Sequence, residues 1–118
     1  SLRERGYVVQ FHRKGLIPNE RLEVDLFLPN LKTAIEIDGP SHFFPIWGEE
    51  HLARNLRSDA QKTGLLITRG FAILRVKHLA KHVSTKHMRD LSNRIIEELE
   101  QIKLEFPSED KRLIEIEV

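Results

Sequence analysis

Apolar and polar residues alternate most regularly between positions 22 and 38 of this chain. The segment LEVDLFLP carries leucine or valine at positions 22, 24, 26 and 28, and KTAIEID carries isoleucine at positions 35 and 37. A repeat of two residues is typical of a β-strand, whose side chains point alternately to the two faces of a sheet. Because the turn-forming stretch PNLK separates the two segments, the pattern predicts a β-hairpin centred on Asn30 and Leu31.

Two other stretches repeat with the spacing of an α-helix. Positions 52, 56, 60 and 63 form one stripe, which predicts a helix over about 49–63 that ends at Gly64. Positions 88, 91, 95, 99 and 102 form the apolar stripe of a second helix, and Ser84 or Thr85 can cap its N-terminus. Both helices are therefore expected to be amphipathic and to pack one face against a sheet.

Short β-rich runs complete the pattern. Residues 7–11 and 71–77 predict strands, and RLIEIEV at the end of the chain is either an edge strand or a tail. The order strand, hairpin, helix, strand, helix predicts an α/β fold, with helices packed on a mixed sheet. SLRERG reads as the last turn of a helix stopped by Gly6, so we expect the chain to be a fragment that lacks N-terminal parts of a longer protein.

Composition narrows the class of protein. The chain has 118 residues, 40% hydrophobic and 31% charged, which fits one globular domain over residues 1–118. It has no cysteine, which excludes disulfides, zinc–thiolate sites and a thiol nucleophile. No apolar run approaches the ~20 residues of a membrane span, so we expect a soluble, cytoplasmic protein with no membrane partner.

The hairpin gathers carboxylates at one end. If its strands pair about positions 30 and 31, Asp25 faces Glu36 and Glu23 faces Asp38. Directly opposed like charges are destabilising, so a positive group is expected among them. Oxygen ligands without cysteine favour Mg²⁺, with Mn²⁺ as a substitute. The alternative is that these acids simply form the solvated face of an antiparallel sheet.

Three further residues lie near this cluster in the sequence. His42 follows the Gly39-Pro40 turn and is either a general acid or base near neutral pH or a side chain that caps the turn. Asp59 and Lys62 share a helix face at a spacing of three residues. They form either a surface salt bridge or part of the carboxylate site, where Lys62 would offset charge or contact a phosphate.

These motifs together carry a resemblance to a known family. EVDLFLPNLKTAIEIDGPSHF, followed by Asp59, Lys62 and GFAILR, resembles the PD-(D/E)XK nuclease superfamily. The chain is most similar to very-short-patch-repair endonucleases and to phage homing endonucleases of the EDxHD type. The resemblance covers about two-thirds of the chain and implies an αβββαβ restriction-endonuclease-like core.

The resemblance also implies roles for individual residues. Asp25, Glu36 and Asp38 would hold a divalent cation, and His42 would be the acid or base beside the scissile phosphate. In the usual motif a lysine stands where this chain has Asp38, so either Lys62 or His42 would take the lysine's role. The implied catalytic set is therefore Asp25, Glu36, Asp38, His42, Asp59 and Lys62.

These observations lead us to expect a Mg²⁺-dependent DNA endonuclease that hydrolyses phosphodiester bonds, of homing or repair type and from a bacterial or phage context. Its partner would be double-stranded DNA, and both a further DNA-binding domain and a homodimer are compatible with this expectation. Backbone phosphates would be held by basic residues near the cleft, namely Arg13, Lys14, Arg54 and Arg57. IEIDGPSHF also resembles RAP domains, so an RNA-binding module without catalysis is the alternative, and a structural or interaction domain is a third.

Overall fold

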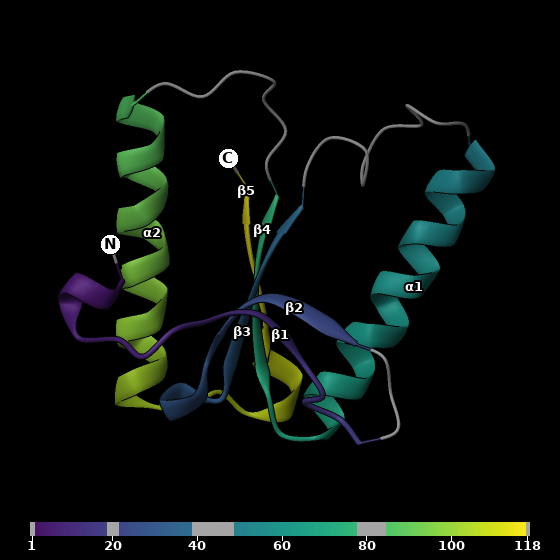
Figure 1. The fold of residues 1–118 in the computed structure, drawn as a ribbon, viewed down its shortest axis with the longest axis horizontal. Coiled ribbons are helices and arrows are strands. Elements are labelled where there is room, and N and C mark those ends of the chain that lie inside the picture. The colour runs from purple at the N-terminus through teal and green to yellow at the C-terminus, as the bar shows by residue number, and fades with distance from the viewer. Residues whose placement is uncertain (1, 19–21, 39–48, 78–84, 118) are drawn as a thin grey trace.

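The structure, a computed structural model, describes residues 2–18, 22–38, 49–77 and 85–117. Five strands and two α-helices lie in these ranges, together with short 3₁₀ turns (Figure 1). The elements are β1 (Gln10–Lys14), β2 (Glu23–Leu28), β3 (Thr33–Asp38), α1 (Glu49–Thr68), β4 (Ala72–Lys77), α2 (Thr85–Leu104) and β5 (Leu113–Glu117). The prediction of a mixed α/β fold is confirmed, and the C-terminal segment is a strand rather than a tail.

The strands form one sheet in the order β1-β2-β3-β4-β5. Neighbours are antiparallel from β1 to β3 and parallel from β3 to β5. The predicted hairpin register is confirmed, because Leu28 pairs with Thr33 and Leu26 pairs with Ile35. The turn between them is a 3₁₀ turn at Pro29–Leu31, followed by Lys32 in the left-handed region.

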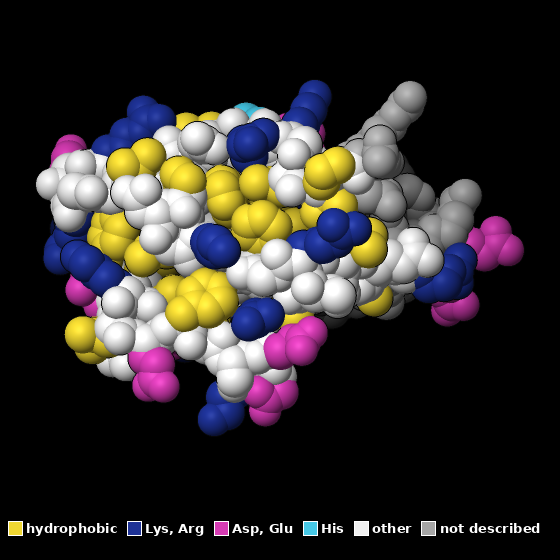
Figure 2. Space-filling model, turned by 90° about the horizontal axis from the view of Figure 1, so that it is seen from below, with side chains coloured by type: hydrophobic (Ala, Val, Ile, Leu, Met, Phe, Trp, Pro, Cys, Tyr) yellow, Lys and Arg dark blue, Asp and Glu magenta, His cyan; other side chains and the backbone are white. Residues whose placement is uncertain are grey.

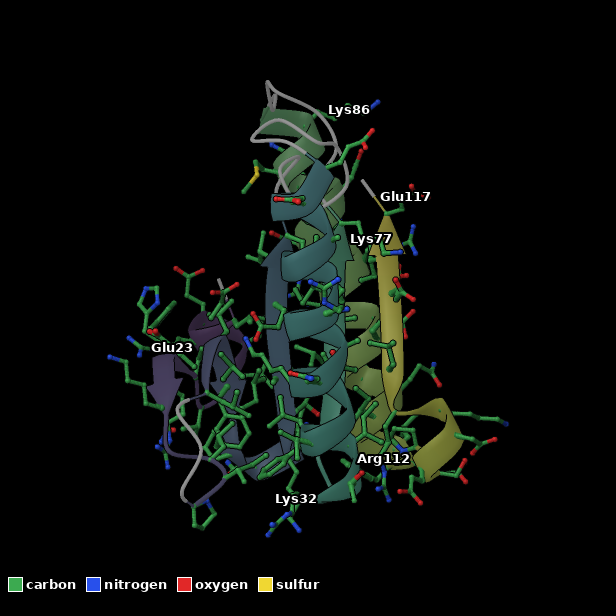
Figure 3. All side chains as sticks on the ribbon, turned by 90° about the vertical axis from the view of Figure 1, so that its right-hand side faces the viewer. Glu23, Lys32, Lys77, Lys86, Arg112 and Glu117 are labelled. Carbon is green, nitrogen blue, oxygen red and sulfur yellow. The ribbon has the colours of Figure 1, made fainter. Side chains whose placement is uncertain are left out.

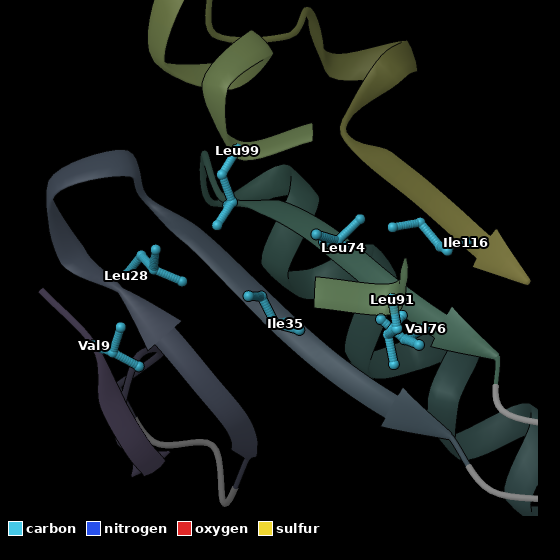
Figure 4. Packing of buried hydrophobic residues seen from close by; sticks show 8 residues of the cluster. All are labelled: Val9, Leu28, Ile35, Leu74, Val76, Leu91, Leu99 and Ile116. Carbon is cyan, nitrogen blue, oxygen red and sulfur yellow. The ribbon is translucent and has the colours of Figure 1, made fainter. Parts of the chain in front are cut away.

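The two helices cover opposite faces of the sheet (Figure 1). Leu74 of β4 packs with Leu91 and Leu99 of α2, whereas the adjacent Ile73 packs with Leu66 of α1. Figure 4 shows the larger, α2-side cluster, which is entirely apolar. The connection from β3 to β4 through α1 and the connection from β4 to β5 through α2 advance in the same direction across the sheet. Because the two helices lie on opposite faces, one connection is right-handed and the other is left-handed, which departs from the usual right-handed rule.

The end of α1 differs from the prediction. The helix does not stop at Gly64 but continues through LLIT to Thr68. Gly70, at φ 95°, provides the actual stop: its N–H donates to Ile67 and the next N–H, of Phe71, donates to Leu66. This is the paired hydrogen bonding of a Schellman cap. Leu66 is fully buried, and that burial outweighs the cost of about 1 kcal/mol for a glycine inside a helix.

The sequence predicted the elements of the N-terminal segment only in part. Arg3–Arg5 form a 3₁₀ turn that ends at Gly6 in the left-handed region, as the glycine predicted. The first strand is Gln10–Lys14 rather than residues 7–11, so that Arg13 and Lys14 belong to the sheet. Within the described ranges, no helix is both long enough and apolar enough to cross a membrane.

Candidate functional site

Two acidic side chains are buried at the carboxyl end of β3. Glu36 and Asp38 are each 7% exposed, and they alternate with Ile35 and Ile37 along the strand. Ala34, on the same strand face as the two acids, packs in the cluster that contains Leu66 of α1. The acids therefore lie between the sheet and α1, at the end of the sheet where the parallel strands β3 and β4 both finish. Such strand ends are where α/β proteins commonly build their sites.

Asp25 of β2 reaches the same place from the neighbouring strand. The pairing of β2 with β3 extends to Leu26 opposite Ile35. Beyond it, the Asp25 carboxylate accepts a hydrogen bond from the Ile37 main-chain N–H, with 2.9 Å between Oδ2 and N. The Asp25 side chain also shares a hydrogen bond with Glu36, as the hairpin register predicted. Asp25 and Glu36 therefore form a pair of adjacent acids, and the Asp25 charge helps to raise the pKa of Glu36.

Lys62 of α1 provides the positive charge that the carboxylates require. Its Nζ lies 2.5 Å from Oε1 of Glu36, and both side chains are largely buried. Burial raises the pKa of Glu36 to about 7; Lys62 opposes this rise, and the Asp25 charge adds to it. The close approach of the ammonium makes Lys62 the charged partner of Oε1 among the described residues. The sequence hypothesis that Lys62 belongs to the carboxylate site agrees with this contact.

Asp38 faces a different cation. Its Oδ2 lies 3.2 Å from Nε of Arg75, which is on the adjacent strand β4. Arg75 also donates from Nη2 to Oγ1 of Thr63 on α1, at 2.7 Å. Reasoning from sequence assigned no site role to Arg75 or Thr63. The available signal was the charged residue Arg75 between the apolar Leu74 and Val76 of FAILRVK, on the face opposite these two side chains.

The remaining predicted residues are not all gathered here. Glu23 lies beside His12 on β1, with 3.5 Å between Oε1 and Nδ1, rather than beside Asp38. Figure 3 shows Glu23 on the β1–β2 side of the sheet, away from Lys77. His42 lies outside the described residues, as do the side chains of two residues on α1, Arg54 and Asp59.

The predicted phosphate-binding residues lie on two elements. Arg13 and Lys14 are at the end of β1, where they pair with Val24 and Glu23 of β2. Arg57 is exposed on α1, on the helix that carries Lys62. Of this group, the structure therefore places three residues on the two elements that border the acidic pair.

The carboxylates of this site can be compared with the ligands that Mg²⁺, the cation implied by the resemblance, requires. Among the described side chains, no three histidine or carboxylate groups converge closely enough to form a metal site by themselves. The pair Asp25 and Glu36 does fit Mg²⁺, which is commonly held by one or two carboxylates together with waters and substrate phosphates. A bound ion would share the Glu36 carboxylate with the Lys62 ammonium, which lies 2.5 Å from Oε1.

A second polar region lies at the opposite pole of the molecule. Figure 2 looks onto this pole and shows basic side chains around an apolar patch. Lys32, Lys103 and Arg112 line a hollow there of about 600 Å³. Arg112 donates from Nη1 to the Ile67 carbonyl in the last turn of α1, so it compensates a helix end. Helix capping thus accounts for Arg112, and among the described residues the buried acids, Glu36 and Asp38, lie on β3 rather than around this hollow.

Asp25, Glu36 and Lys62 therefore form one group of interacting charges around the buried Glu36 carboxyl. The chain matches no protein-family model, no curated protein and no solved structure. What the site does is accordingly inferred from its residues and their contacts.

Proposed function

We propose that this chain is the catalytic domain of a metal-dependent DNA endonuclease with a restriction-endonuclease-like core. One observation carries the proposal: the buried acid Glu36 lies at a strand end, with the acid Asp25 and the ammonium of Lys62 against it. The mixed sheet, with a β1–β3 meander and α1 crossing to β4, supplies the order of elements that such a core requires.

The burial of Glu36 beside a second acid favours catalysis over binding alone. Removing a carboxylate from water is costly, and a second carboxylate beside it raises the cost further. A surface that only binds RNA needs exposed cations and aromatic groups, not a buried acid pair. Perturbed acids held together by the fold are instead common at catalytic sites. The pair therefore favours the nuclease over the RNA-binding module as the function of this chain.

The proposed cofactor is Mg²⁺, with Mn²⁺ as a substitute. Asp25 and Glu36 would hold the ion, and when bound it supplies Lewis acidity to the phosphodiester oxygens. Burial raises the pKa of Glu36 to about 7, so without the ion this carboxyl is partly protonated near neutral pH and would release its proton when it binds the cation. Lys62 keeps positive charge beside Glu36, and its ammonium can donate to a phosphate oxygen.

The substrate would reach this site across the two elements that border it. Arg13 and Lys14 on β1 and Arg57 on α1 would contact backbone phosphates, which position a duplex without reading its sequence. Proton transfer by His42 and a supporting role for Asp59 remain part of the proposal.

The test is relaxation of supercoiled plasmid in Mg²⁺, in Mn²⁺ and in EDTA. We expect the wild type to nick or cleave in either metal and to be inactive in EDTA. Glu36→Gln should lower the rate by at least about 100-fold, the effect of losing one group that stabilises a transition state. Glu109→Gln makes the same chemical change at an exposed position and should cleave as the wild type does.

The outcomes separate the competing functions. If the wild type gives no product in either metal, the nuclease proposal is wrong for this chain. Salt-sensitive RNA binding without cleavage would instead support the RNA-binding module. Equal cleavage by Glu36→Gln and wild type would show that the acid pair is not the catalytic site.

A further inference from the structure

Arg75 connects the sheet to α1 directly beside the acid pair. In the parallel pairing of β3 and β4, Arg75 stands opposite Glu36. Its guanidinium meets Asp38 of β3 through Nε, at 3.2 Å, and Thr63 of α1 through Nη2, at 2.7 Å. The Arg75 side chain is only 15% exposed, so both contacts are made largely away from water.

The shape of the guanidinium gives this connection its precision. The group is planar and presents its donors in a fixed fork, so two partners held by one arginine are also held relative to each other. Asp38 attracts the guanidinium of Arg75 as an ion pair, in which Nε makes no directed hydrogen bond. The directed hydrogen bond of Arg75 is the one from Nη2 to Thr63, which ties α1 to β4. Thr63 is the neighbour of Lys62, whose ammonium meets Glu36. The contact is therefore placed to set how Lys62 approaches the acid pair.

Other described contacts of α1 hold a different part of the helix. The α1 side chains in the apolar cluster are Leu65, Leu66 and Ile67, all toward the helix C-terminus from Lys62. Glu49, Glu50 and Arg57, in the N-terminal half, are exposed. Within the described set, the link from Arg75 to Thr63 is thus a partly buried polar contact that joins α1 to the sheet directly beside the Lys62–Glu36 ion pair.

We infer that Asp38, Arg75 and Thr63 form a clamp that positions Lys62 against Glu36, and that Asp38 acts through Arg75 rather than as a metal ligand. In the proposed nuclease these three are positioning residues, so the consequence for catalysis rests on the proposed function. The inference also gives a reason for an acid where related nucleases carry lysine. The site's lysine comes from α1, and the acid on β3 serves to hold that helix in place.

The first test measures the position of Lys62 without any cleavage. The full chain is treated briefly with an amine-acetylating reagent, and the labelling rate of each lysine is read by peptide mass spectrometry. Exposed Lys103 is the internal reference. Thr63→Val removes only the hydroxyl that Arg75 binds and keeps the shape of the side chain. We expect it to speed Lys62 labelling by about 2- to 10-fold, the range that the net loss of one hydrogen bond allows.

Thr68→Val is the matched control. Thr68 lies on the same helix, and its hydroxyl donates to the Gly64 carbonyl rather than to the sheet. It should leave Lys62 labelling as in the wild type. Arg75→Lys, which keeps the charge but loses the fork, and Asp38→Asn should both speed labelling as Thr63→Val does. Thermal unfolding followed by circular dichroism checks that each variant is folded.

Each outcome decides part of the inference. Unchanged Lys62 labelling in Thr63→Val overturns the clamp, and this variant is informative even if Arg75→Lys does not fold. If Thr63→Val speeds labelling but a folded Asp38→Asn does not, the role of Asp38 is overturned. In the cleavage assay, Thr63→Val should lower kcat and leave the Mg²⁺ concentration dependence unchanged. Because labelling needs no cleavage, failure of the nuclease proposal and failure of the clamp are distinguishable.

Discussion

The two faces of the sheet are built from the same strands but are used in opposite ways. On β4, Leu74 points into the apolar cluster beneath α2, whereas the next residue, Arg75, points toward α1 and bonds Thr63. On β3, Ile35 and Glu36 divide in the same manner. A step of one residue along either strand therefore moves from a dry core to a buried network of charges.

The energetic meaning of the two faces differs as well. A fully buried leucine or isoleucine contributes about 1.5–3 kcal/mol to folding, so the α2 face supplies net stability. Buried ion pairs often contribute little, because the loss of hydration offsets the attraction between the charges. The charged part of the α1 face is thus expected to add little stability, which is typical of a region retained for function. We therefore predict that substitutions of apolar residues on the α2 face will lower mainly stability, whereas substitutions of charged residues on the α1 face will lower mainly activity.

The largest effect should come from the α2 face. Leu99 is fully buried in the apolar cluster, and Leu99→Ala should lower the free energy of unfolding by about 3 kcal/mol, within the range for cavities left by such truncations. Urea unfolding followed by circular dichroism measures this change. Leu104→Ala is the same substitution at the end of the same helix, where the side chain is 81% exposed. It should cost less than about 0.5 kcal/mol. A loss below about 1 kcal/mol for Leu99→Ala would contradict an α2 face that carries the stability.

The acid pair should make stability depend on pH in the opposite sense from an ordinary salt-bridged acid. The folded-state pKa of Glu36 is about 7, above the ordinary value of 4.5 for this side chain, so the folded chain keeps a proton that the unfolded chain has lost. Stability is therefore full below about pH 4.5 for this group and falls as the pH rises from there to about 7. With about 1.4 kcal/mol for each pKa unit, the loss is at most about 3 kcal/mol. Urea unfolding in EDTA, repeated from pH 5 to pH 8, measures it.

Glu36→Gln separates this contribution from other titrating groups. The variant cannot ionise at position 36, so its unfolding free energy should fall less between pH 5 and pH 8 than that of the wild type. Exposed Glu109→Gln should follow the wild-type profile. If Glu36→Gln and wild type have parallel pH profiles, Glu36 is not held in its protonated form by the fold.

Local patterns in the sequence were sufficient for the hairpin and its acids. The alternation over residues 22–38 and the PNLK turn together determine which residues pair, because a shift of one position would turn every side chain to the other face. The contact between Asp25 and Glu36 follows directly from that register. The mixed sheet with packed helices was likewise predictable from the order of the elements.

The features that the sequence did not reveal depend on contacts between distant segments. Arg75 and Asp38 are far apart along the chain, and only the parallel pairing of β3 with β4 brings them together. The stop predicted at Gly64 was wrong because the burial of Leu66 against the sheet extends the helix. A glycine in the local sequence cannot indicate how much packing against the sheet stabilises the helix beyond it.

Substitution of Gly64 should give the smallest change in stability of these predictions, and it tests α1, the helix on the charged face of the sheet. It lies inside α1, and a Cβ placed on it would meet no atom within 4 Å. Gly64→Ala should therefore raise the free energy of unfolding by about 0.5–1 kcal/mol, because alanine loses less backbone entropy in a helix. Gly70→Ala should do the opposite, because Gly70 has a φ of 95° that alanine adopts only with strain. If Gly64 instead ended the helix in the left-handed region, as its sequence context predicted, Gly64→Ala would destabilise the chain as well. The sign of this one change therefore decides whether α1 passes intact beside Thr63 and Lys62, which the clamp requires.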